Sequence, residues 1–138
     1  MKKKEKIIAI VLVIFLFLFW YFTNSRTKDA KTINTDSEVY SDFEINNAIF
    51  SAKLYFALNF KNCRLIDIGY AGDESVVAAQ EWAKDFHAGK VIILTSSFET
   101  DDKRGDGSLM PDKVYEGWQW IMVKRFGFLW LHKTHGYG

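Results

Sequence analysis

The hydrophobic and polar positions divide the chain into one long apolar run and several shorter segments with helical or strand periodicity. The run "IIAIVLVIFLFLFWYF" is unbroken from Ile7 to Phe22. As a helix it spans about 24 Å, and flanking lysines can snorkel to complete a ~30 Å hydrocarbon core. The pattern predicts a transmembrane signal anchor over residues 7–23, preceded by a basic cytoplasmic stub over residues 1–6.

The orientation of this predicted anchor follows from charge. The lysines of residues 1–6 hold the amino terminus in the cytoplasm under the positive-inside rule. No small-x-small cleavage site follows the run, and no cysteine there could carry a lipid. A cleaved, secreted form is the alternative. We predict a single-pass protein of the cell membrane whose C-terminal domain is extracytoplasmic.

The pattern of the rest of the chain predicts a tether followed by one folded domain. Residues 24–40 are polar and lack sustained periodicity, which predicts a flexible tether. The domain is expected over residues 41–138, a length that suits a single core.

Two helices are expected in this domain. Ser41 and Glu44 match a capping box, and apolar residues at helical spacing continue to about Asn59. A second amphipathic helix is expected over residues 73–88, with Gly89 where a left-handed helix end is wanted.

Four segments have strand character. "CRLIDIGY" alternates apolar and polar residues, "KVIILTSSF" is continuously apolar, and "YEGWQWIMVKR" and "FLWLHKTH" flank Phe126-Gly127. In chain order the domain is α-β-α-β-β-β. We predict an α+β fold in which, after the transmembrane helix, two helices pack on a mainly antiparallel four-stranded sheet. The helix between the first two strands leaves a parallel crossover open.

Charge and cysteine content exclude several classes of partner. Beyond residues 1–6 the basic residues fall from 18 to 14 and the acidic residues from 17 to 16. No basic stripe remains, which argues against nucleic acid. The single Cys63 has no zinc-ligand spacing around it and is expected to be a small buried residue. No metal or other cofactor is expected.

The C-terminal strand holds two of the three histidines. His132 and His135 are three residues apart, so a regular strand directs them to opposite faces. They cannot share a metal ion unless the strand bulges. A two-residue turn at Phe126-Gly127 predicts that Ile121 pairs with His132 and Trp118 with His135. A three-residue turn would shift this pairing by one.

Both faces of this hairpin are largely apolar, which is more than one helical layer explains. One explanation is a homodimer, or a protein partner, covering the second face. The other is that the first helix and the tether cover one face and the second helix covers the other.

The candidate ligand-binding residues are Trp118, Trp120, His135, Tyr115 and Asp106. His135 beside the two tryptophans could act as an acid or base near neutral pH. A structural histidine bonded to a backbone carbonyl is the alternative, since no second titratable partner lies at an obvious spacing. No catalytic residue is assigned.

The loop from Thr100 to Asp112 is acidic, and carboxylates are the ligands that calcium prefers. Its spacing is not that of an EF-hand, because Lys103 and Arg104 stand where ligands are needed. The loop is better interpreted as a turn-rich recognition element.

The segments "GDGSL…Y…WQWIMV" and "W…H…HGYG", behind "NFKNCRL" and "EWAKDF", resemble a family of small exported bacterial domains of unknown function. The resemblance covers residues 41–138. It implies a nuclear-transport-factor-2-like or cystatin-like α+β fold, in which a curved sheet wraps a long helix. "DDKR" before Gly105, and Thr134 before the last histidine, depart from the family's usual small and acidic residues. No Asp–His pair is therefore carried over.

Two functions remain from the sequence. The first is a membrane-anchored, noncatalytic binding or assembly module that uses the aromatic sheet face and the loop of residues 100–112. The second is a small-ligand pocket protein or an enzyme that uses His135 near Trp118 and Trp120. No nucleophile elbow, phosphate loop or carboxylate pair at diagnostic spacing is present, which favours the first.

Overall fold

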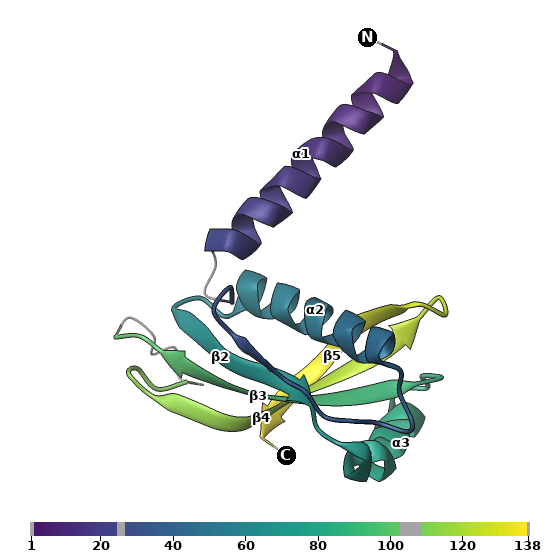
Figure 1. Cartoon of the computed structure of the whole chain (residues 1–138), viewed down its shortest axis with the longest axis vertical. Helices are drawn as coiled ribbons and strands as arrows, with labels where there is room; N and C mark the ends of the chain where they lie inside the picture. Colours follow the sequence, from purple (N-terminus) through teal and green to yellow (C-terminus); the bar gives the residue numbers. More distant parts are fainter. Residues whose placement is uncertain (1, 25–26, 103–108, 138) are drawn as a thin grey trace.

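The computed structural model describes residues 2–24, 27–102 and 109–137, which form three α-helices and a five-stranded mixed sheet. The elements are α1 (Lys3–Asn24), β1 (Lys31–Ile33), α2 (Asp42–Asn59), β2 (Cys63–Tyr70), the 3-10 helix η1 (Asp73–Ser75), α3 (Val76–Asp85), β3 (Val91–Thr100), β4 (Val114–Arg125) and β5 (Leu129–Tyr137). The strand order is β1-β2-β3-β4-β5, with β1 parallel to β2 and the later neighbours antiparallel. Figure 1 shows α2 lying across one face of the sheet and α3 against the other.

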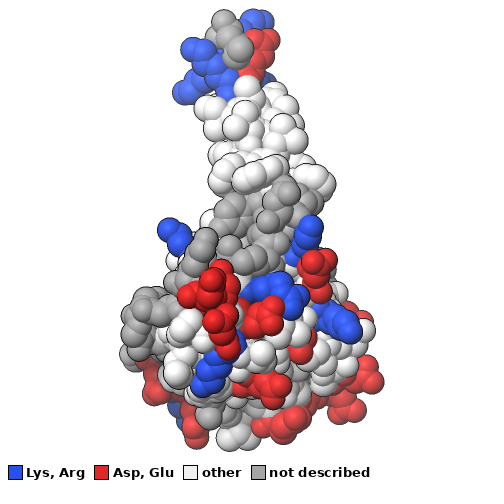
Figure 2. All heavy atoms as spheres, turned by 90° about the vertical axis from the view of Figure 1, so that its left-hand side faces the viewer, with Lys and Arg blue, Asp and Glu red and all other residues white. Residues whose placement is uncertain are grey.

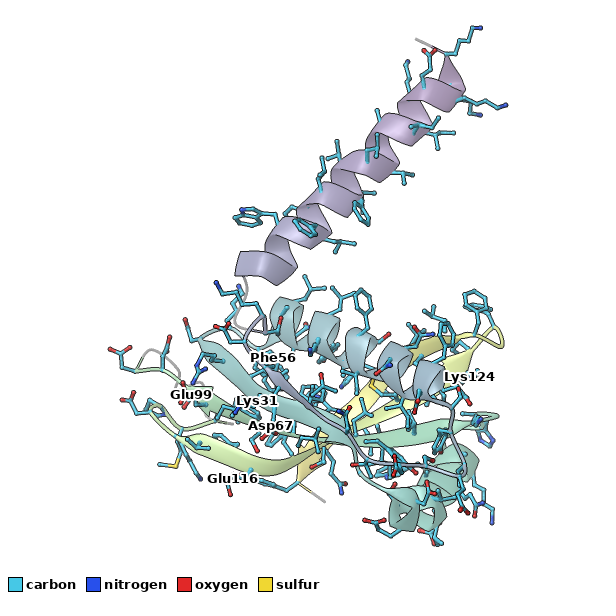
Figure 3. All side chains as sticks on the ribbon, in the orientation of Figure 1. Lys31, Phe56, Asp67, Glu99, Glu116 and Lys124 are labelled. Atoms are coloured by element: carbon cyan, nitrogen blue, oxygen red, sulfur yellow. The ribbon has the colours of Figure 1, made fainter. Side chains whose placement is uncertain are left out.

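The helix α2 is held by the cap that the sequence predicts. Ser41 Oγ accepts a hydrogen bond from the backbone N–H of Glu44 at 3.1 Å, and Glu44 Oε1 accepts one from the Ser41 N–H at 3.3 Å. Both halves of the capping box are therefore formed. One face of α2 is buried on the sheet, and Phe56, only 1% exposed, lies at this interface (Figure 3).

Each face of the sheet is covered from within the chain. Trp120 packs in the larger core under α2, which Tyr40 joins from the segment before that helix. On the opposite face Ile121 and Val123 pack with Ala79 of α3 in a smaller core. A helix on each face accounts for the burial of Trp120, Ile121 and Val123, as the second explanation above expects. Leu129 and Leu131 of the hairpin are 38% and 41% exposed, and a partner on this hairpin stays a prediction.

The strand β1 lies inside the segment for which the sequence predicts a flexible tether. It pairs with β2, placing Lys31 opposite Asp67, and Thr27 before it is 2% exposed. Further along, Ser37 Oγ donates to Asp73 Oδ1 at 2.6 Å. The predicted count of four strands is therefore wrong. Three exposed residues are too few to show a periodic pattern, and backbone pairing holds them.

The helix α1 corrects the prediction of a membrane anchor. Among the described residues, no helix has the length and apolar character needed to span a bilayer. The helix begins with charged residues, and the apolar run of residues 7–22 covers about 24 Å of helix against a ~30 Å hydrocarbon core. The transmembrane signal anchor from Ile7 to Phe22 is thus wrong, and the single-pass cell-membrane location that depended on it is corrected with it. Figure 2 shows charged side chains at the start of α1 and on the folded body, with uncharged ones between.

Candidate functional site

The strand β5 contains a bulge that places both C-terminal histidines on one face. Met122 pairs with His132, but the next pair is Ile121 with Thr134, so Lys133 is an extra residue in the ladder. A regular strand would separate the two histidines, whereas one extra residue returns His135 to the face of His132. The prediction that they point to opposite sides is therefore wrong.

The turn of the hairpin also differs from the expected one. Arg125 pairs with Leu129, so residues 126–128 lie outside the ladder and the two-residue pairing is wrong. Phe126 and Gly127 both have positive φ, 57° and 79°. A three-residue turn shifts the pairing by one, and the bulge at Lys133 adds a second shift, so that Trp118 pairs with Tyr137 and not with His135.

The two histidines are in direct contact. His132 Nε2 and His135 Nδ1 lie 2.9 Å apart, a hydrogen-bonding distance. The ring of Tyr55, from α2, stacks on His132 with the ring centroids 3.6 Å apart and the planes at 13°. His135 lies against Trp118 and Phe60, with centroid distances of 5.6 and 5.1 Å. Aromatic rings from α2 (Tyr55), from its C-terminal cap (Phe60) and from β4 (Trp118) therefore hold the pair in place.

The surroundings of the pair favour neutral imidazoles. Burial, and then the neighbouring His135, lowers the pKa of His132 to about 4. Burial also lowers the pKa of His135. Desolvation disfavours the charged form of a histidine, so both rings are uncharged near pH 7.

The residues predicted to bind a ligand meet in one aromatic cluster. Trp120 is fully buried, and its Nε1 donates to Ser96 Oγ at 2.8 Å. Tyr115 is 5% exposed, and its hydroxyl accepts from the backbone N–H of Met110 at 2.8 Å. The Nε1 of Trp118 is buried and has no hydrogen-bond partner among the residues that the structure describes. Trp118, Trp120, Tyr115 and His135 are thus close together. Trp120 and Tyr115 are core residues, Trp118 is half-buried against that core, and His135 is exposed. Asp106 lies outside the described residues.

An apolar groove of about 620 Å³ lies between α2 and β5. None of its lining residues is Lys, Arg, Asp or Glu. The lining residues are Asn47, Phe50, Ser51, Leu54, Tyr55, Leu58, Asn59, Phe128, Leu129, Trp130, Leu131 and His132. Phe50 and Leu131 are 58% and 41% exposed, so the groove opens to solvent.

Sequence reasoning missed this groove, although a signal for it exists. Phe50, Leu54 and Leu58 recur every four residues along α2, as a second apolar stripe beside the buried one. The contact of His132 with its neighbour has no comparable signal, because the bulge in β5 arises from pairing with β4.

Metal binding through three or more protein ligands has no support in the described chain. Within residues 2–24, 27–102 and 109–137, no three His, Cys, Asp or Glu side chains lie together as a metal site. The loop between β3 and β4, which carries the predicted recognition element, is described only at its ends, residues 101–102 and 109–113.

Comparison with known proteins adds no relative. No protein-family model, curated protein or solved structure matches the chain. The resemblance to exported bacterial domains therefore stays a prediction, and function is argued from the groove and the histidine pair.

Proposed function

We propose that this chain is a noncatalytic binding module that holds an uncharged, apolar segment of a partner protein in the groove between α2 and β5. The observation that carries the proposal is the groove itself. It has a volume of about 620 Å³, its lining carries no acidic or basic side chain, and it borders the last strand of the sheet. Exposed apolar surface rimmed by polar residues is typical of protein interaction sites.

The position of β5 supports an extended partner. In the described part of the chain β5 pairs only with β4, so its outer edge presents unpaired backbone groups. An extended segment can add to such an edge through main-chain hydrogen bonds, with alternate side chains in an adjacent groove. Natural edge strands are commonly protected by charge, but residues 128–131 carry none and Lys133 comes only beyond them.

The surroundings of the histidines favour binding over catalysis. Within the described residues, the polar contact of His132 and His135 is with each other, and no carboxylate hydrogen-bonds to either. A general base needs a partner that sets its tautomer and its pKa. The enzyme that uses His135 near Trp118 and Trp120 therefore has less support than the binding module.

Peptide selection on the full chain tests this proposal. Random peptides displayed on phage are selected for binding to the full chain, which is immobilised at low density. One selected peptide is then synthesised, and its affinity is measured by fluorescence anisotropy. We expect selected sequences to be rich in apolar residues and poor in charge. Phe50→Glu should weaken binding at least about tenfold, because a buried charge replaces an apolar contact of hot-spot size.

Phe43→Glu is the matched control. Phe43 is on the same helix and is 73% exposed, but it does not line the groove, so this variant should bind as the unchanged chain does. Failure to select any peptide, or equal loss in both variants, would show that the groove holds no such segment. If light scattering shows a dimer that Phe50→Glu dissociates, the occupant is a second copy of the chain and the proposed partner is wrong.

A further inference from the structure

The bulge at Lys133 brings His132 and His135 into contact, and the proposed binding groove does not need this contact. A bulge leaves a residue without a ladder partner and weakens local pairing, and such bulges are common where a strand must redirect a side chain. Here the redirected side chain is His135, which meets His132 at 2.9 Å.

We infer that His132 Nε2 and His135 Nδ1 form a two-histidine chelate for a divalent copper or nickel ion. Two nitrogens 2.9 Å apart, each bound to a metal at about 2.05 Å, subtend an angle of about 90° at that metal. Adjacent positions of a square-planar or tetragonal ion are separated by this angle, which is the geometry of Cu²⁺ and Ni²⁺. A tetrahedral zinc ion requires the two nitrogens to be about 3.4 Å apart.

The site is held in place before any ion arrives. Tyr55 stacks on the ring of His132, and Trp118 and Trp120 lie 5.6 and 5.3 Å from the ring of His135. Packing keeps the two nitrogens close to the separation that the ion requires, so chelation needs only a reorientation of the facing lone pairs, and this partial preorganisation favours binding. Since no three potential ligands cluster in the described residues, this part of the chain supplies two ligands, and we expect water to fill positions that no other group takes.

The proton balance of binding is simple. In the hydrogen-bonded pair one facing nitrogen carries a proton and the other offers its lone pair. On binding, the donor ring moves that proton to its other nitrogen, so that both facing lone pairs turn to the metal. Both imidazoles stay neutral, which is the form in which histidine binds metal.

Calorimetry and electron paramagnetic resonance on the full chain, without any peptide present, test the inference. We expect one Cu²⁺ per chain, with affinity in the order Cu²⁺ above Ni²⁺ above Zn²⁺, and a tetragonal Cu²⁺ spectrum with two imidazole nitrogens. His132→Gln or His135→Gln should each weaken Cu²⁺ binding at least about tenfold and remove one nitrogen from the spectrum.

The third histidine provides the matched control. His87 is exposed and lies just beyond α3, which packs on the sheet face opposite α2, whereas the pair stacks on Tyr55 of α2. His87→Asn should leave Cu²⁺ affinity unchanged, because asparagine tolerates the positive φ of 50° at this position. Binding that all three variants weaken equally, or a spectrum with a single imidazole nitrogen, would show adventitious surface coordination and overturn the inference. Peptide binding is measured separately, so either result stands without the other.

Discussion

At the scale of single residues, His87 occupies the position that ends α3. Its backbone N–H donates to the Lys84 carbonyl at 3.2 Å, and the Ala88 N–H donates to the Ala83 carbonyl at 2.9 Å. These two bonds form a Schellman motif, whose left-handed residue is usually glycine. The sequence predicts Gly89 at this position, but α3 ends at Asp85 and the left-handed residue is His87, with φ of 50°.

Replacement of this histidine should stabilise the fold. His87→Gly removes the steric cost of a side chain at positive φ, and we expect the free energy of unfolding to rise by about 0.5–1 kcal/mol. Urea unfolding followed by circular dichroism measures the change. His87→Ala is the comparison, since it truncates the side chain but keeps the Cβ. If His87→Ala raised the free energy of unfolding by the same amount, the gain would come from loss of the side-chain atoms beyond Cβ, and the backbone explanation would be wrong.

The histidine pair shows the limit of residue-by-residue prediction. The sequence places His135 next to the two tryptophans and identifies it as a candidate, and the structure brings these rings together. It assigns His132 to the other face, because it assumes a regular strand. The three-residue turn moves His132 to the face of Met122 and Trp120, and the extra residue at Lys133 keeps His135 on that face.

At the scale of elements, the junction of β1 with β2 depends on a close approach at Gly69. Gly69 pairs with Ile33, and a Cβ built on Gly69 would lie 2.5 Å from the Ile33 carbonyl oxygen and 2.7 Å from its Cβ. Real side chains do not tolerate such contacts, so any other residue at position 69 forces β1 away from β2.

Two alanine substitutions separate this contact from a general effect of glycine. Gly69→Ala should lower the free energy of unfolding by about 1–3 kcal/mol, the usual cost of an overpacked contact. Gly89→Ala should change it by less than about 0.5 kcal/mol, because nothing lies within 4 Å of its added Cβ. Denaturant unfolding measures both, and amide exchange of residues 31–33 locates the loss. Equal destabilisation by the two variants would argue against the steric explanation.

At the scale of the whole molecule, Glu44 joins three elements that are distant in sequence. Its Oε2 accepts hydrogen bonds from Lys90 Nζ at 2.8 Å and Lys124 Nζ at 3.3 Å, while its capping bond to Ser41 holds the start of α2. Lys124 lies near the amino-terminal end of α2 in Figure 3. Burial alone would raise the pKa of Glu44, but these hydrogen bonds outweigh burial and lower the pKa to about 2.

This network should make stability depend on pH in a defined window. The folded pKa of about 2 is below the ordinary value of 4.5, so the stabilisation is complete above pH 4.5 and is lost as the pH falls toward 2. Glu44→Gln should cost about 1–3 kcal/mol at pH 7 and should flatten the decline of stability between pH 4.5 and 2. Urea unfolding at a series of pH values measures the free energy of unfolding of the unchanged chain and of Glu44→Gln. Parallel pH profiles for the two chains would show that Glu44 does not carry the dependence.

The sequence alone determined the elements with strong local signals. Ser41 and Glu44 predict the start of α2 because a capping box is formed by groups three residues apart. The alternating and continuous apolar runs predict β2 to β5 because the side chains of a strand alternate between its faces. These signals need no knowledge of what lies across the sheet.

Only the tertiary structure decided how those elements meet. The pairing of β1, the extra residue at Lys133 and the turn of residues 126–128 depend on a partner strand far away in the sequence. Each involves one to three residues, too few for a periodic pattern, and a shift of one residue changes the face of every side chain beyond it. The histidine pair follows from those shifts within β5. The groove forms between α2 and β5, which are far apart in the sequence.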